Sequence, residues 1–236
     1  MNLQNKTVFV TGATRGIGQA VAIAYQAAGA KVIGTGTKAS SGIKLDGYFQ
    51  TNFDEYEQLH ACADFVRRVK PDVLINNAGT NHNESFVDID AQEFERIHRV
   101  NVLAPLKLCQ AALPHMIAKK WGRIINISSI WGKISKEHRA SYSASKFALD
   151  GMTTALAIEH ATDGILANCI APGFTDTELT RKILGEEGIR QIVATIPIRR
   201  MASTEEIARF VIWLGGPENT YITGQNIAID GGFTRA

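Results

Sequence analysis

The sequence predicts an α/β protein built on one doubly wound parallel sheet with helices on both faces. Short apolar runs occur at residues 8–10, 31–33, 73–75, 124–127, 166–170 and 227–229, mostly separated by longer segments of helical spacing. A glycine-rich turn directly follows the first run. Because parallel neighbours need right-handed crossovers, helices should cover both faces and ligands should bind at the strands' C-terminal edge.

Length and composition predict a single domain over residues 1–236. A chain of 236 residues with 45% hydrophobic content can bury one large core, and it carries no internal repeat or proline-rich linker. A weaker strand is expected at 48–51, with a loop or one helical turn between 34 and 47, where helical periodicity is low. The segment 178–200 has no pattern that predicts its structure.

Charge and cysteine usage favour a small-molecule ligand and a cytoplasmic location. The net charge is +2, from 25 basic and 23 acidic residues without a long single-sign run, so no nucleic-acid or membrane partner is expected. Cys62, Cys109 and Cys169 are widely separated, which argues against disulfides and a zinc site. We expect no bound metal. No signal segment or membrane span is expected, since no apolar stretch reaches about 18 residues.

The first strand leads into Thr11-Gly-Ala-Thr-Arg-Gly-Ile-Gly18 and then a helical stretch at 19–28. Glycines at 12, 16 and 18 allow a sharp turn and close approach to a ligand, and the helix start offers free N–H groups to a pyrophosphate. The motif therefore predicts dinucleotide binding. Its spacing differs from the common Gly-x-Gly-x-x-Gly, so a plain tight turn remains the alternative.

The second strand favours NADP(H) over NAD(H). An acidic residue about 20 positions after the glycine loop usually meets a free ribose 2′-hydroxyl, but residues 1–45 contain no Asp or Glu. Arg15, Thr37 and Lys38 could instead bind a 2′-phosphate. NAD(H) stays the alternative if Lys38 is merely solvated.

Tyr142 and Lys146 share one helical face, four residues apart, and Ser129 ends an earlier buried strand. A free tyrosine has a pKa of about 10, so acid–base work at neutral pH needs a nearby cation to stabilise the phenolate. Ser129 could hydrogen-bond the substrate oxygen. The Tyr-x-x-x-Lys spacing alone is a common accident on helices, and Ser129 makes the functional interpretation stronger.

On these residues the chain resembles the short-chain dehydrogenase/reductase family, with its Rossmann-like fold. The matches are Thr-Gly-x-x-x-Gly-x-Gly at 11–18, Asn-Asn-Ala-Gly at 76–79, Ser129, Tyr-x-x-x-Lys at 142–146 and Pro-Gly at 172–173. They run in order from the first strand to 224–232. The stretches at 11–18, 32–37, 172–177 and 221–224 are most similar to the 3-oxoacyl-(acyl-carrier-protein) reductase group.

The resemblance implies an oxidoreductase that moves a hydride to or from a carbonyl or hydroxyl carbon. Tyr142 would be the proton donor or acceptor, Ser129 would orient the reacting oxygen, and Lys146 would support the tyrosine and bind nicotinamide ribose. Asn101 would hold a water that links the lysine to solvent. Residues to about 130 would bind the cofactor, and those from about 131 would serve catalysis and substrate binding.

The predicted cofactor contacts combine the glycine loop, the second strand's end and positions implied by the resemblance. Asn52 and Phe53 would border the adenine, and Thr175 and Thr177 would meet the carboxamide and phosphates. The full set is Gly12, Thr14, Arg15, Gly16, Ile17, Gly18, Thr37, Lys38, Asn52, Phe53, Asn77, Ala78, Gly79, Tyr142, Lys146, Pro172, Gly173, Thr175 and Thr177.

Two features depart from a reductase that uses an acidic acyl carrier protein. Lys119 and Lys120 fit the group's basic docking face, but Asp163 stands where an arginine is expected and should weaken encounter. The charged loop at 131–139, with Asn-His-Asn-Glu at 81–84, could line a polar pocket for a sugar, polyol or other hydroxylated substrate. A solvated loop is the alternative.

Two further expectations concern class and assembly. A non-catalytic cofactor sensor or scaffold is the alternative to an enzyme, although the intact set of Asn101, Ser129, Tyr142 and Lys146 favours the enzyme. The resemblance implies a homotetramer built on the helices at 94–118 and 145–162. Their apolar residues could instead face the monomer's own sheet; they are Leu103, Leu106, Leu108, Ala148, Leu149, Met152, Leu156 and Ile158.

Overall fold

The computed structural model describes residues 2–236, except for the side chains of Leu179 and Ile183. Seven strands form one sheet in the order β3-β2-β1-β4-β5-β6-β7, and every neighbouring pair is parallel. The predicted doubly wound fold is therefore confirmed. The strands are β1 (Thr7–Val10), β2 (Lys31–Gly36), β3 (Gly47–Gln50), β4 (Val73–Asn76), β5 (Gly122–Ile127), β6 (Ile165–Pro172) and β7 (Asn226–Ile229).

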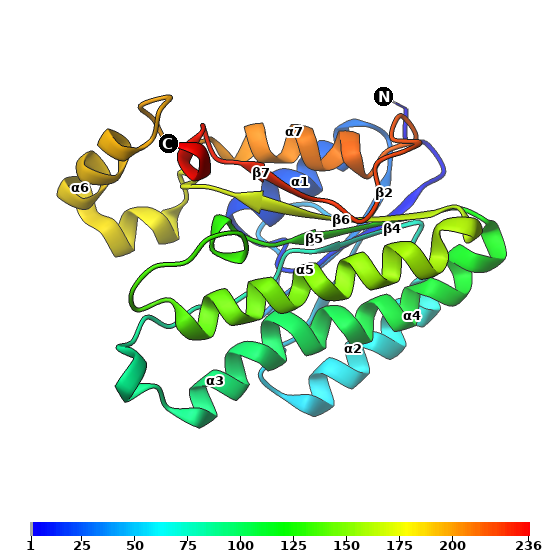
Figure 1. Cartoon of the computed structure of the whole chain (residues 1–236). Coiled ribbons are helices and arrows are strands. Elements are labelled where there is room, and N and C mark those ends of the chain that lie inside the picture. Colours follow the sequence, from blue (N-terminus) through cyan, green and yellow to red (C-terminus); the bar gives the residue numbers. More distant parts are fainter. Residues whose placement is uncertain (1) are drawn as a thin grey trace.

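Helices cover both faces of this sheet. Figure 1 shows α2, α4 and α5 on one face and α1 and α7 on the other, while α6 projects beside the C-terminus. The helices are α1 (Gly16–Ala27), α2 (Tyr56–Val69), α3 (Ala91–His98), α4 (Ala104–Lys119), α5 (Ala140–His160), α6 (Glu178–Thr195) and α7 (Thr204–Leu214). Since strand order reverses between β1 and β4, the loops after these two strands diverge and leave a ligand crevice at the C-terminal edge.

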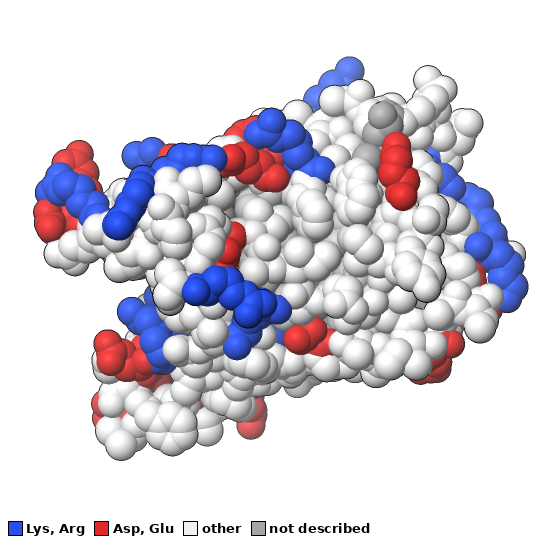
Figure 2. All heavy atoms as spheres, turned by 45° about the horizontal axis from the view of Figure 1, so that its top comes forward, with Lys and Arg blue, Asp and Glu red and all other residues white. Residues whose placement is uncertain are grey.

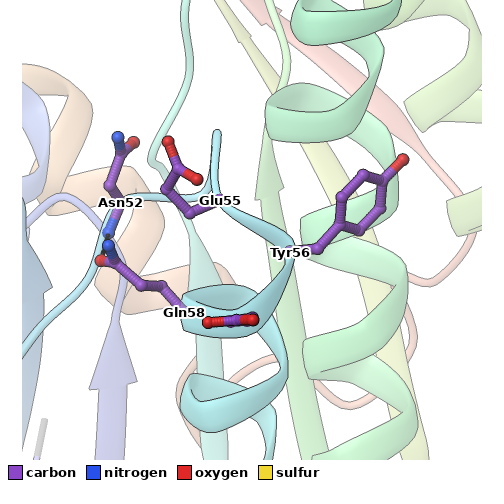
Figure 3. Close-up of a pocket in the computed structure, with 5 residues that line it drawn as sticks. Asn52, Glu55, Tyr56 and Gln58 are labelled. Carbon is purple, nitrogen blue, oxygen red and sulfur yellow. Dashed lines mark hydrogen bonds between the residues drawn. The ribbon is translucent and has the colours of Figure 1, made fainter.

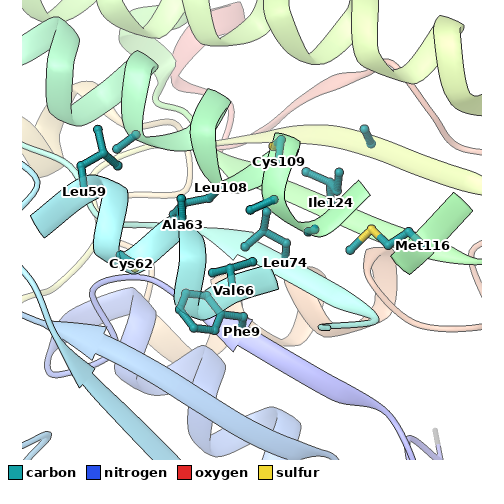
Figure 4. Packing of buried hydrophobic residues seen from close by; sticks show 14 of the residues in the cluster. Phe9, Leu59, Cys62, Ala63, Val66, Leu74, Leu108, Cys109, Met116 and Ile124 are labelled. Atoms are coloured by element: carbon teal, nitrogen blue, oxygen red, sulfur yellow. The ribbon is translucent and has the colours of Figure 1, made fainter. Parts of the chain in front are cut away.

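The core consists of one apolar cluster on each face. On the α2 and α4 side, Phe9 and Leu74 from the sheet pack against Leu59 of α2 and Leu108 of α4, all fully buried (Figure 4). On the other side, α1 and α7 cover the opposite side chains of the same strands. The strands alternate their side chains between the two clusters, as a sheet buried on both faces requires.

The structure defines three segments more closely than the sequence pattern did. The stretch after β2 contains no helix through Asp46, so the predicted loop is confirmed. The predicted helix at 94–118 is interrupted by a π-helical turn, Arg99–Leu103, between α3 and α4. The unpredicted segment forms α6, which kinks at Gly185, where φ is +61°.

A buried polar ladder ties the sheet to α5. The Asn76 side chain donates to the Asn126 amide oxygen (2.8 Å), and the Asn126 amide donates to the Thr153 hydroxyl (2.7 Å). All three residues are almost fully buried. Because each donated hydrogen bond satisfies a group that water cannot reach, the ladder fixes β4, β5 and α5 relative to one another.

A buried carboxylate anchors the opposite end of the sheet. Asp72, before β4, accepts from the Thr7 amide (2.9 Å) and from the Lys119 ammonium at the end of α4. Burial by itself raises the pKa of Asp72, but the hydrogen bonds from Lys119 and Thr7 outweigh it and hold the pKa below its ordinary value. The ionised form therefore stabilises the folded state.

We predict that Asp72→Asn lowers the free energy of unfolding at pH 7 by about 1–3 kcal/mol, the usual contribution of a hydrogen bond to a charged group. A carboxyl whose pKa is lowered in the folded state stabilises the fold fully at pH values above its pKa in the unfolded state. This stabilisation is lost as the pH falls through the pKa of the folded state. Urea unfolding should therefore show the difference from wild type shrinking from pH 5 to pH 3. The control is Asp64→Asn, whose ion pair with Arg67 is exposed. A difference that stays constant over this range would contradict the prediction.

Candidate functional site

The predicted catalytic side chains meet at the end of β5. Lys146 lies one turn after Tyr142 on α5, and its ammonium is 5.5 Å from the centre of the Tyr142 ring. The same ammonium donates to the Ile127 carbonyl (2.8 Å), the last residue of β5. Ser129 follows two residues later and is nearly buried. Its hydroxyl oxygen accepts from the Trp131 amide (3.2 Å), which leaves the hydroxyl hydrogen free to donate.

Asn101 joins the loop after β4 to the catalytic helix. It sits in the π-helical turn, and such turns often mark functional sites. Its amide nitrogen donates to the Thr80 carbonyl and the Ser145 hydroxyl, both at 2.9 Å, and its amide oxygen accepts from the Thr80 amide (2.9 Å). Both N–H donors of Asn101 are therefore occupied, so a relay water would have to contact its oxygen or the backbone.

Gly79 leaves open the space between Asn101 and Lys146. A Cβ atom at this position would lie 3.3 Å from the Asn101 amide oxygen and 3.7 Å from the Lys146 nitrogen. A side chain here would therefore enter the region beside both polar groups. This open space is consistent with a bound cofactor at the position where the sequence predicts the nicotinamide ribose.

The glycine loop forms the predicted strand, turn and helix. Gly12 and Gly16 have positive φ angles of +65° and +55°, and α1 begins at Gly16. A Cβ at Gly18 would lie 2.3 Å from both the Asn77 amide nitrogen and the Gly12 carbonyl oxygen, so no side chain fits there. Ile17 packs against the core on the α1 face. The turn therefore presents backbone rather than side chains to a ligand.

The end of β2 lies against the glycine loop. The Ala13 amide donates to the Thr35 carbonyl (2.8 Å), and a Cβ at Gly36 would lie 2.5 Å from a Thr14 methyl carbon. Thr37 and Lys38 follow directly and are exposed, as is Arg15. Within the described part of the chain, neither cation has a hydrogen-bond or ion-pair partner, so both are available to an anion.

The segment after β6 returns to the glycine loop. A Cβ at Gly16 would lie 3.5 Å from the Thr177 methyl group, so these two predicted cofactor residues are neighbours. Thr177 caps α6 by accepting from the Thr180 amide (3.1 Å). Thr175 is buried, and its hydroxyl donates to the Gly173 carbonyl (3.2 Å), which shapes the turn after Pro172.

The predicted adenine contacts lie after β3. Phe53 is buried in the core, so only its backbone can border a ligand. Asn52 lines a pocket of about 420 Å³ with residues at the start of α2, and Figure 3 shows its side chain beside that of Glu55. A second pocket, of about 680 Å³, lies along α3 and includes His82 and Glu84. Neither pocket is lined by Ser129, Tyr142 or Lys146.

The two polar segments that the sequence predicts beside the substrate are in contact. The Glu84 amide donates to the His138 carbonyl (3.3 Å), and His138 has a positive φ of +63°. The Lys133 ammonium donates a hydrogen bond to the Asn226 carbonyl (2.7 Å). The loop at 131–139 is therefore held by a contact near each end, while residues 135–138 between them are exposed to solvent.

Sequence reasoning missed an aromatic cluster at this site and the packing of Arg139 against it. Trp131, Phe174 and Phe233 pack edge to face with ring centres 5.3–6.4 Å apart. The Arg139 guanidinium lies 5.6 Å from the centre of the Trp131 ring. The predicted charge of the loop included Arg139, but no spacing rule links Phe174 and Phe233 to a tryptophan so far away in sequence.

The expected docking face is neutralised within the chain. Lys120 forms an ion pair with Asp163 (2.6 Å), and Asp163 also contacts His160 (3.2 Å). Hydrogen bonds from Lys120 and then His160 lower the pKa of Asp163. Lys119 is paired with Asp72. Figure 2 shows a face of the protein on which basic and acidic side chains are interspersed.

The remaining chemistry-bearing groups are structural. Cys62, Cys109 and Cys169 are free and buried, and burial raises the pKa of each thiol to about 12, so they are poor nucleophiles. Residues 2–236, as described, contain no cluster of three side chains able to hold a metal ion. Nor does any helix among them have the length and apolarity to span a membrane.

Known proteins match this chain along nearly its whole length. The family model described as enoyl-(acyl carrier protein) reductase matches residues 12–234. The 3-oxoacyl-(acyl-carrier-protein) reductase FabG of Vibrio cholerae is 36% identical, with 98% of each chain covered. FabG of Escherichia coli K12 is 34% identical with the same coverage.

Solved structures give the same fold with different named activities. A short chain dehydrogenase/reductase family protein is 32% identical, with a TM-score of 0.91 over 99% of this chain and 100% of its own. A candidate gluconate 5-dehydrogenase from Beutenbergia cavernae, with bound NADP, is 30% identical, with a TM-score of 0.92 over 100% and 99%. By family match, identity and fold, the chain belongs to the short-chain dehydrogenase/reductase family of oxidoreductases.

Proposed function

We propose that the protein is an NADP(H)-dependent oxidoreductase acting on the carbonyl or hydroxyl carbon of a small polar substrate, in preference to a carrier-bound acyl chain. One observation carries the choice of substrate class. Lys119 and Lys120 are both paired with acids of their own chain, Asp72 and Asp163. An acidic carrier protein would find little free positive charge on this face.

The chain's own residues supply the proton chemistry. A bound nicotinamide cofactor would supply or accept the hydride. In reduction, Tyr142 donates its phenolic proton to the carbonyl oxygen, and the free Ser129 hydroxyl hydrogen donates to the same oxygen as negative charge develops. Lys146 stabilises the phenolate, with one N–H held by Ile127 and the others available to Tyr142 and the ribose. Asn101 positions this helix through Ser145.

The proposed preference for NADP(H) rests on charge at the end of β2. Arg15, Thr37 and Lys38 are exposed, and the two cations have no partner among the described residues. A 2′-phosphate would be met by a guanidinium fork, an ammonium and a hydroxyl. Bound NADP is named for the Beutenbergia cavernae structure, which supports the same choice here.

The second candidate is reduction of a 3-oxoacyl group on acyl carrier protein. The FabG relatives favour it, since they are 34–36% identical over 98% of this chain. Overall identity does not separate substrate binding from cofactor binding, which any substrate of the family would need. The paired lysines make this candidate weaker than the first.

We also propose a cytoplasmic homotetramer, with residues to about 130 binding cofactor and the remainder serving catalysis and substrate binding. Of the apolar residues predicted at subunit contacts, Leu108 and Leu149 face the monomer's own core. Ile158 is 74% exposed and Phe147, also on α5, is 47% exposed, which supports association through that helix.

We predict that the double change Arg15→Ala and Lys38→Ala raises the KM for NADPH by roughly 10- to 100-fold, from the loss of charge-assisted hydrogen bonds. The KM for NADH should change by less than about threefold, since NADH lacks the phosphate. Steady-state kinetics with both cofactors measure this. Lys44→Ala removes another exposed cation of the same loop region and is the control. Equal losses with NADH and NADPH would contradict the assignment.

We predict that Tyr142→Phe lowers hydride transfer by at least about 100-fold, the usual contribution of general acid–base catalysis. Cofactor binding should persist, since the ring and Lys146 remain. The assay follows NADPH absorbance with a panel of oxo acids, sugars and thioesters, and fluorescence titration measures binding. Tyr221→Phe is the control, because Tyr221 is 95% exposed. Unchanged turnover would refute the mechanism; a wild type that binds NADPH but reduces no panel member would favour the non-catalytic alternative.

We predict that wild-type kcat/KM for acetoacetyl-acyl carrier protein exceeds that for acetoacetyl-coenzyme A by no more than about threefold, since little free positive charge steers the carrier. Asp163→Arg, which frees Lys120, should raise this ratio by roughly three- to tenfold in a salt-sensitive manner. The control is Glu218→Arg, which makes the same charge change at another exposed position and should leave this ratio unchanged. A strong, salt-sensitive carrier preference in wild type would establish the second candidate instead.

A further inference from the structure

Arg139 is a partly buried cation without a partner. It lies immediately before α5, three residues from Tyr142. The other arginines that are buried or partly buried, Arg96, Arg99 and Arg123, all donate to carboxylates or backbone carbonyls. No described residue accepts a hydrogen bond from the Arg139 side chain. None of the Arg139 nitrogens is both buried and unpaired, so its five N–H donors reach solvent and are available to a ligand.

The Arg139 guanidinium lies beside Trp131 and near Tyr142. The guanidinium packs against Trp131, which follows Ser129 by two residues and is held by Phe174 and Phe233. Burial lowers the pKa of Arg139, while the nearby phenolate charge of Tyr142 acts in the opposite direction. The cation is therefore close to both the proton donor and a rigid aromatic wall.

Lys136 and Glu137 of the same loop are exposed, and two further charged groups near Arg139 already have partners. Lys133 donates to the Asn226 carbonyl. The Glu84 carboxylate contacts His82 (3.7 Å) and accepts from the Asp90 amide (3.4 Å). Neither group neutralises Arg139 or offers the same fork of donors. An anion entering beside Tyr142 would therefore find the Arg139 guanidinium free to bind it.

We propose that Arg139 binds a carboxylate of the substrate and makes the enzyme selective for hydroxy or oxo acids, with sugar acids as the class that also uses the polar segment at 81–84. This proposal rests on the proposed function, which it makes more specific. A carboxylate accepts two parallel N–H bonds from a guanidinium, and the buried Trp131 ring holds that guanidinium from one side. The residue determines specificity; Tyr142 and Ser129 perform the chemistry.

The test compares substrates that differ only in the carboxylate. D-gluconate and D-glucitol share one carbon chain and differ at C1, as do D-galactonate and galactitol, and D-mannonate and mannitol. With NADP⁺, wild-type kcat/KM for the best acid should exceed that for its alcohol by at least about tenfold. Arg139→Ala should lower kcat/KM for the acid by roughly 10- to 100-fold and for the alcohol by less than about threefold. Arg139→Lys keeps the charge but not the forked pair of N–H donors. Its kcat/KM for the acid should lie between those of the wild type and Arg139→Ala.

The matched control is Arg68→Ala. Arg68 also stacks on an aromatic ring, with its guanidinium 5.8 Å from the centre of Phe65, but it lies on the exposed side of α2. Arg68→Ala should leave the ratio of kcat/KM for the acid to kcat/KM for the alcohol unchanged. Equal losses for acid and alcohol in Arg139→Ala, or no selectivity for acids in wild type, would overturn the proposal. A higher kcat/KM for glucitol 6-phosphate than for gluconate would mean that the site selects a phosphate rather than a carboxylate. That result would also overturn the proposal.

A binding measurement separates this inference from the proposed function. Calorimetry of gluconate, galactonate and mannonate with the NADP⁺-loaded protein does not depend on turnover. Binding of an acid that Arg139→Ala weakens at least tenfold supports the Arg139 assignment even where no alcohol or acid is oxidised, and in that case only the proposed activity fails. If none of the three acids binds the wild-type protein, the Arg139 assignment fails while NADP(H)-dependent reduction of other substrates stands.

Discussion

The site depends on the hydrogen bonds that join the ends of β1 and β4. The Asn77 amide donates to the carbonyls of Thr11 (2.9 Å) and Gly12 (3.1 Å). In return, the Thr11 hydroxyl accepts from the backbone amides of Asn77 and Ala78, both at 2.9 Å. These bonds lie where the strand order reverses, so they hold together the two loops that border the ligand crevice. Gly18 packs onto the same amide, which fixes the start of α1 there as well.

From this junction the proposed catalytic residues are positioned through a short chain of contacts. Asn77 is followed by Gly79 and Thr80, and Thr80 makes two hydrogen bonds to the Asn101 side chain. Asn101 then reaches Ser145, the neighbour of Lys146. Each link uses a buried polar group whose partner is another part of the site, so a shift in one loop would leave a donor or acceptor unsatisfied. The cofactor loop and the catalytic helix are thus held in one arrangement.

The parts of this arrangement that depend on local sequence could be predicted. Apolar runs located β1, β4, β5 and β6, and the Tyr-x-x-x-Lys spacing placed two side chains on one face of α5, because strand and helix periods follow directly from the backbone. The π-helical turn at Arg99–Leu103 was not predicted, since it adds a residue to a helix without changing its composition. The partner of Asp163 was also not predicted. Lys120 and Asp163 are far apart in sequence and meet only because β5 and β6 are neighbours.

The distribution of charge differs between the outer surface and the site beside Tyr142. At the surface, Asp163 and Asp72 cancel two lysines that could have attracted an acidic partner. Beside Tyr142, by contrast, Arg139 is left without an acid, although its desolvation is unfavourable unless an anion is present. An unpaired guanidinium beside the proposed proton donor is what the proposed recognition of a substrate carboxylate requires, whereas the two lysines of the outer surface are already paired.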